Sequence, residues 1–87
     1  MYEVRLTKKA YKRLARAPET VQILFDELSE ELRTSGPIRS NWPNFSKLGA
    51  EKFHCHLNYR WVACWQHTKG SVTIEVYYVG SREDAPY

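Results

Sequence analysis

The sequence predicts an α+β fold in which two helices pack on one face of a twisted antiparallel sheet. Apolar and polar residues alternate near the N-terminus and through the C-terminal half, which predicts strands, while a stripe at helical spacing lies between these regions. The predicted order is therefore β-α-α-β-β-β(-β). The 87 residues, 43% of them hydrophobic, are enough for one core, so residues 1–87 are expected to form a single domain.

The N-terminal half contains the predicted helices. Residues 2–6 alternate as a first strand, and Thr7 is placed to cap a helix over residues 8–16. Pro18 suits the first turn of a second helix, and Gly36-Pro37 ends it. Its core-facing stripe follows the spacing i, i+3, i+4, i+7 and i+11, through Val21, Leu24, Phe25, Leu28 and Leu32.

The C-terminal half contains the predicted strands. Residues 37–50 form a connector with a short strand near Phe45, residues 53–65 a β-hairpin, and residues 72–79 a last strand. A three-residue turn, Leu57-Asn58-Tyr59, would place His56 opposite Arg60 on the open face. A two-residue turn, Asn58-Tyr59, would reverse Arg60 to the helix side, so we prefer the first register. In the last strand, Val72, Ile74, Val76 and Tyr78 are expected to share one face.

The period of two places His54 and His56 side by side on the face that the helices leave open. Arg60, Arg82 and Tyr87 are expected to join them, with Glu75 as an orienting partner. The set combines groups that titrate near neutral pH with fixed cations and a phenol, which suits cleavage of a phosphodiester. One group takes the proton of a ribose 2′-hydroxyl, arginines stabilise the phosphorane, and an acid protonates the leaving 5′-oxygen. This route needs no metal or other cofactor.

The two histidines have three other interpretations. Zinc binding by His54, His56 and His67 lacks a further ligand at recognisable spacing. Cysteine nucleophilic catalysis is disfavoured because Cys55 and Cys64 are expected on the helix side, as reduced core residues. The third alternative is that both histidines are ordinary exposed residues of a strand.

Charge and hydropathy limit the classes of partner. The net charge is +3, and residues 8–16 carry five cations, which form either a solvated face or a surface that contacts phosphates or a partner. We expect RNA contacts from Lys8, Lys9, Lys12, Arg13 and Lys52. No signal peptide or apolar run of membrane-spanning length occurs, so the expected location is the cytoplasm, with no membrane partner.

Taken together, the motifs resemble the RelE/ParE superfamily of type II toxin–antitoxin modules. The resemblance covers nearly the whole chain, and it includes Lys47-Leu48-Gly49, Tyr59-Arg60-Trp61-Val62 and Val76-Tyr77-Tyr78-Val79-Gly80-Ser81-Arg82. The pattern FHCHL…VACW…IEVYYVG…EDAPY is similar to a RelE-like subgroup with paired histidines and a terminal Ala-Pro-Tyr.

The resemblance implies an mRNA interferase, an endoribonuclease that cuts mRNA in the ribosomal A site and inhibits translation. It implies His54 or His56 as general base, Arg60 and Arg82 on the scissile phosphate, and Tyr87 stacking on a base or assisting proton transfer. A cognate antitoxin is implied as a partner, in a hetero-oligomer. The alternatives are a ParE-like, non-enzymatic inhibitor of DNA gyrase and an inactive RNA-binding relative.

Overall fold

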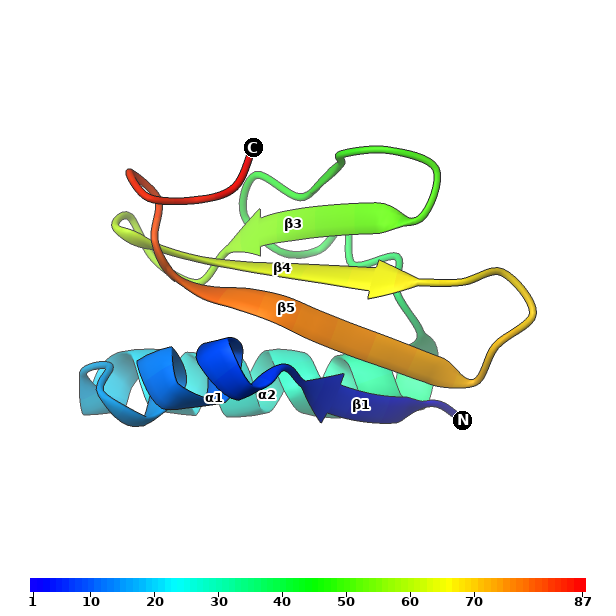
Figure 1. Ribbon diagram of the computed structural model, residues 1–87, viewed down its shortest axis with the longest axis horizontal. Helices are drawn as coiled ribbons and strands as arrows, with labels where there is room; N and C mark the ends of the chain where they lie inside the picture. The colour runs from blue at the N-terminus through cyan, green and yellow to red at the C-terminus, as the bar shows by residue number, and fades with distance from the viewer.

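Two helices pack against a five-stranded sheet in the computed structural model, which describes residues 1–87 (Figure 1). The elements are β1 (Glu3–Leu6), α1 (Lys8–Ala15), α2 (Glu19–Ser35), β2 (Ser46–Lys47), β3 (Lys52–His56), β4 (Trp61–His67) and β5 (Thr73–Ser81). The strand order is β1-β5-β4-β3-β2, which confirms the predicted α+β fold. One detail differs, because β1 pairs with β5 in parallel and the sheet is therefore mixed. Since α1 and α2 follow β1 along the chain, no hairpin constrains its direction.

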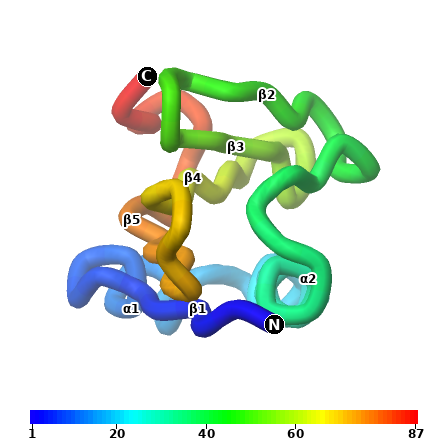
Figure 2. The backbone as a smooth tube through the Cα atoms, turned by 90° about the vertical axis from the view of Figure 1, so that its right-hand side faces the viewer, coloured from blue at the N-terminus to red at the C-terminus, as the bar shows by residue number.

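The helices begin and end where the sequence predicts. The Thr7 side chain accepts a hydrogen bond from the Ala10 N–H at 3.1 Å and so caps α1. Gly36, with φ of 95°, ends α2 in a conformation that glycine adopts without steric cost. The buried residues of α2 pack on one face of the sheet, and α1 runs beside β5 beyond the end of β1 (Figure 1). Figure 2 views α2 end-on, with β1 between it and α1.

The hairpin between β3 and β4 has neither of the two predicted turns. Its loop is Asn58-Tyr59-Arg60, and His56 pairs with Val62 rather than with Arg60. The Asn58 side chain accepts hydrogen bonds from the N–H groups of Arg60 (2.9 Å) and Trp61 (2.8 Å), which closes the loop one residue later than expected. Tyr59 lies in the middle of this loop and is 73% exposed.

Two further predictions about faces were wrong. Cys64 pairs directly with His54 across β3 and β4. Because directly paired residues point to the same face of a sheet, Cys64 lies on the open face with His54. A bulge at Tyr77 interrupts the β4–β5 ladder, because Cys64 pairs with Tyr78 whereas Trp65 pairs with Val76. Tyr78 is thereby turned to the open face, where it forms a small cluster with Val62 and Cys64.

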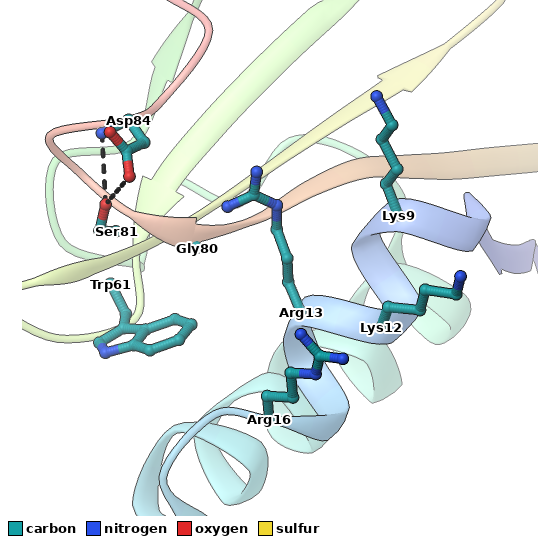
Figure 3. A pocket seen from close by; sticks show the side chains of 8 residues that line it. All are labelled: Lys9, Lys12, Arg13, Arg16, Trp61, Gly80, Ser81 and Asp84. Atoms are coloured by element: carbon teal, nitrogen blue, oxygen red, sulfur yellow. Dashed lines mark hydrogen bonds between the residues drawn. The ribbon is translucent and has the colours of Figure 1, made fainter.

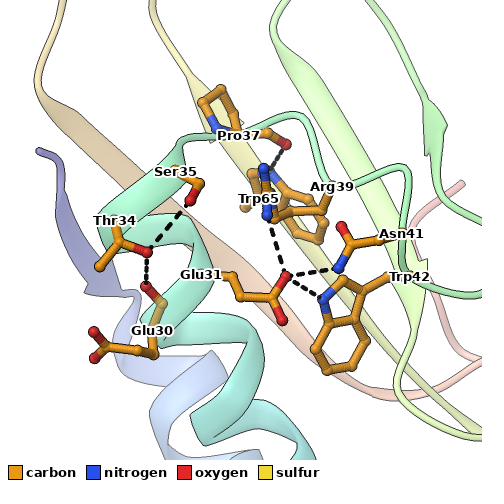
Figure 4. Close-up of polar contacts among 9 residues, drawn as sticks. All are labelled: Glu30, Glu31, Thr34, Ser35, Pro37, Arg39, Asn41, Trp42 and Trp65. Atoms are coloured by element: carbon orange, nitrogen blue, oxygen red, sulfur yellow. Dashed lines mark hydrogen bonds and ion pairs between the residues drawn. The ribbon is translucent and has the colours of Figure 1, made fainter.

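The segment between α2 and β2 is tied to α2 by one carboxylate. Glu31 Oε1 accepts hydrogen bonds from Arg39 (3.1 Å), Asn41 (2.8 Å) and the Trp42 indole (3.0 Å), as Figure 4 shows. These bonds, led by the Asn41 bond, hold the pKa of Glu31 below its ordinary value. The segment leads directly into β2, so this anchor helps to set the position of the sheet edge beside the two histidines.

None of the helices has the length and apolar character that a membrane crossing requires.

Candidate functional site

His54 is the most buried polar residue of the open face, at 7% exposed. Its Nδ1 lies 2.9 Å from Ser46 Oγ on the neighbouring strand β2, so Nε2 is the nitrogen left to exchange a proton. Burial, followed by the charge of nearby His56, lowers the pKa of His54 below its ordinary value of 6.5. The imidazole is therefore neutral at pH 7 and able to accept a proton.

His56 lies beside His54, with ring centroids 6.0 Å apart. Its Nδ1 is 3.4 Å from Asn44 Nδ2, and its backbone N–H donates to the Pro43 carbonyl at 2.8 Å. Asn44 has φ of 54°, a left-handed conformation that asparagine tolerates. Ser46 on β2 thus orients His54, and Asn44 in the segment that Glu31 anchors orients His56. The alternation in the sequence could not predict either contact.

The C-terminal tail returns over this face. The Tyr87 ring lies against the His54 ring, with centroids 4.3 Å apart, although Tyr87 is 53% exposed. Burial raises the pKa of the Tyr87 phenol, and the Arg82 charge opposes the increase. The phenol therefore stays protonated at neutral pH and can donate a proton beside an imidazole that can accept one.

Arg60 and Arg82 lie together at the end of the β4–β5 ladder. The Arg82 N–H donates to the Arg60 carbonyl at 2.8 Å, and the two residues line a shallow hollow of about 290 Å³ with Tyr59. The Arg82 guanidinium stacks over the Tyr59 ring at 4.5 Å, and Nη2 lies 3.5 Å from its hydroxyl. Neither arginine forms a salt bridge, so both are free to bind an anion.

The structure brings His54, His56 and Tyr87 together and places the two arginines at the adjoining hairpin end, but it removes Glu75 from the set. Glu75 accepts a hydrogen bond from Gln66 at 2.7 Å, and Ser46 takes the orienting role that we had assigned to it. His67 bonds to the Ser71 carbonyl at 2.8 Å. No group of three His, Cys, Asp or Glu side chains is arranged to hold a metal.

The thiols do not join the chemistry. Cys55 lies in the main core, while Cys64 lies beneath the open face, and both are fully buried. Burial raises the pKa of each thiol to about 12, so neither forms a thiolate at neutral pH.

The residues expected to contact RNA are separated in space. Lys9, Lys12 and Arg13 line one side of a hollow of about 600 Å³ between α1 and the end of β5 (Figure 3). Lys8 is exposed on α1 but does not line it, and Lys52 lies on β3 with its Nζ 5.6 Å from the Tyr77 ring centroid. Arg16 and Trp61, absent from our expected set, also line the hollow.

Comparison with solved structures identifies the fold, whereas no family model and no curated protein sequence matches the chain. Archaeal RelE, from the RelE–RelB complex of Pyrococcus horikoshii OT3, matches with a TM-score of 0.76 and 16% identity over 97% of this chain and 98% of that one. A chain of the E. coli RelBE toxin–antitoxin complex matches with a TM-score of 0.75 and 18% identity, over 93% and 96% respectively. A chain of the YoeB–YefM complex from Staphylococcus aureus matches with a TM-score of 0.71 and 9% identity, over 94% of this chain and 98% of that one. The chain therefore has the fold of the RelE and YoeB toxins.

Proposed function

We propose that this protein is the toxin of a toxin–antitoxin pair and that it cleaves mRNA on the ribosome. The observation that carries the proposal is the contact between His54 and Tyr87, a neutral base and a protonated phenol, on a sheet face whose hairpin end carries two arginines without salt bridges. A surface that only binds a partner has no need of this combination. The fold shared with RelE adds support of an independent kind.

The proposed reaction is transfer of the phosphate to the neighbouring ribose oxygen. His54 Nε2 takes the proton of the 2′-hydroxyl as the O2′–P bond forms. Arg60 and Arg82 stabilise the charge of the phosphorane, and Tyr87 donates its proton to O5′ as the P–O5′ bond breaks. The products are a 2′,3′-cyclic phosphate and a 5′-hydroxyl, and no oxidant, metal or other cofactor takes part. His56, oriented by Asn44, is the alternative base.

The proposed partners follow from this role. The substrate is mRNA in the A site, which places the protein in the cytoplasm. Neighbours of the same fold occur in complexes with RelB and YefM, and we infer a cognate antitoxin that forms a hetero-oligomer with this chain. Lys8, Lys9, Lys12, Arg13 and Lys52 are proposed to contact RNA.

The test is primer extension on a reporter mRNA in a purified translation system containing wild-type protein or the His54→Ala/His56→Ala double variant. We expect breaks in phase with codons for the wild type, only when ribosomes are present, and none for a variant that retains its circular-dichroism melt. Breaks that persist in the variant would contradict the assignment of the base. An absence of breaks combined with inhibition of gyrase supercoiling would replace the nuclease by the ParE-like alternative.

A further inference from the structure

The hollow between α1 and the end of β5 is lined by charges of one sign on its helical side. Lys9, Lys12 and Arg13 of α1 and Arg16 at its C-cap lie at spacings of three and four residues, and so lie on one side of the helix. Trp61 and Asp84 lie opposite them, and Figure 3 shows the indole ring of Trp61 directed toward α1. The volume, about 600 Å³, falls in the range of pockets that bind small molecules.

None of the cations that line the hollow forms a salt bridge. The chain has salt bridges only at Arg5–Glu3, Arg33–Glu30 and Arg39–Glu31, and none involves α1. Asp84, the one acid in the lining, interacts instead with the Ser81 hydroxyl at 3.2 Å. Arg13 additionally stacks over the Tyr78 ring at 5.4 Å. The hollow therefore presents a net positive charge to any anion that enters it.

Trp61 adds an aromatic surface to this charge. Trp42 and Trp65 are buried at 9% and 0% exposed, whereas Trp61 is half-buried, packing partly on the core and partly lining the hollow. An indole next to arginine and lysine side chains is the arrangement by which proteins hold single-stranded nucleic acid, through stacking of a base and contact with its phosphate.

The hollow adjoins the candidate catalytic site. Trp61 pairs with Ser81 at the end of the β4–β5 ladder, and their chain neighbours Arg60 and Arg82 line the second, smaller hollow. Ser81 lines both hollows. An RNA strand with a phosphate between Arg60 and Arg82 would thus enter the α1 hollow with an adjacent nucleotide.

We propose that the hollow between α1 and the β5 end is a nucleotide subsite for single-stranded RNA, in which a base stacks on Trp61 and Lys12, Arg13 and Arg16 hold its phosphate. The proposal extends the proposed nuclease function, since it assigns a second point of contact to the same substrate. An acidic peptide would satisfy the cations but would leave the indole without a planar partner, so RNA fits the lining better.

The test uses tryptophan fluorescence, because Trp61 is the only tryptophan that an RNA in the hollow can reach. We would titrate the protein with 2′-O-methyl hexauridylate, which has no 2′-hydroxyl to attack and so reports binding without cleavage. The proposal predicts saturable quenching that Trp61→Phe removes. It also predicts that Lys12→Gln/Arg16→Gln weakens binding about tenfold or more and lowers the slope of log K against log salt by up to about 0.7, since the subsite holds one phosphate and each neutralised phosphate contributes about 0.7 for single strands.

The matched control is Lys47→Gln/Lys69→Gln, which removes two exposed lysines that line neither hollow and is expected to leave both the affinity and the quenching nearly unchanged. Equal weakening by the control pair would overturn the subsite, as would an affinity that Lys12→Gln/Arg16→Gln leaves unchanged. Hexaglutamate quenching Trp61 at equal or lower concentration would overturn it in favour of an acidic peptide.

Failure of the subsite is distinguishable from failure of the nuclease. Cleavage of mRNA without quenching by the hexanucleotide would remove the subsite and leave the catalytic proposal intact. Quenching by the hexanucleotide with no cleavage of any mRNA would support the subsite while removing the nuclease.

Discussion

At His54, burial, a hydrogen bond and a neighbouring charge act on one imidazole. Ser46 fixes the ring through Nδ1, while burial and His56 both favour the neutral form. The ring is kept unprotonated at neutral pH without needing an acidic partner, which explains why Glu75 is not required. Burial has the converse result at Tyr87, where it raises the pKa and so favours the protonated phenol.

The lowered pKa of His54 predicts a particular pH profile for cleavage. The rate should rise with pH only below the ordinary histidine pKa of 6.5 and stay flat from there to neutral pH, because the base is already deprotonated. Single-turnover cleavage measured from pH 4.5 to 8 would check this. A profile whose acid limb is centred above pH 6.5 would contradict His54 as the base.

Among the elements, α2 carries the largest share of the helical contribution to the core. Leu28 is fully buried, and truncation of a buried leucine leaves a cavity. Leu28→Ala should lower the free energy of unfolding by about 2–5 kcal/mol in a denaturant titration. Ile23→Ala, on the same helix but 52% exposed, is the control and should cost well under half as much. Similar losses for both variants would mean that α2 packs through a different face.

The anchor between α2 and the segment 37–45 predicts a stability that depends on pH. Glu31 has a pKa below its ordinary value of 4.5 in the folded protein, so an unfolded chain binds the proton first as the pH falls. Its contribution is therefore complete above about pH 4.5 and disappears as the pH falls through the folded pKa. Glu31→Gln should cost about 1 kcal/mol at pH 7, because the charged acceptor is replaced by a weaker, neutral one.

The control for this anchor is Glu27→Gln, an exposed acid of α2 with no hydrogen-bonded partner. Denaturant titrations of both variants and the wild type at pH 7 and pH 3.5 should show a deficit for Glu31→Gln that shrinks on acidification. A deficit that stays constant with pH would show that the carboxylate charge has no part in the anchor.

On the scale of the whole molecule, sequence patterns predicted what depends on periodicity. The apolar stripe predicted α2, and the Thr7 cap predicted the start of α1. The alternation in β3 predicted that His54 and His56 lie on the open face. The details that failed depend on contacts far apart in the sequence or on one extra residue. The Asn58 turn moved the hairpin register, and the bulge at Tyr77 reversed Tyr78, neither of which alters local periodicity.

The candidate site was predictable to a similar extent. Residue type and alternation were enough to select His54 and His56, and the expected turn and the end of the last strand added Arg60, Arg82 and Tyr87, whose roles the resemblance then implied. The supporting residues Ser46 and Asn44 could not be predicted, because their role arises only when β2 pairs with β3 and the Glu31 anchor orders the preceding segment. Arg16 and Trp61 were missed because the hollow joins segments 45 residues apart.

The measurement that tests the central claim most directly is cleavage by Arg82→Ala in the purified translation system, with the melting temperature recorded on the same preparation. The Arg82 side chain is exposed and contacts only the Tyr59 ring, so its loss should cost less than about 1 kcal/mol of stability. We predict an unchanged melt, cleavage reduced at least a hundredfold, and full activity for the control Arg33→Ala on α2. Undiminished cleavage by a folded Arg82→Ala protein would contradict the binding of the scissile phosphate by Arg60 and Arg82, on which the proposed catalytic site depends.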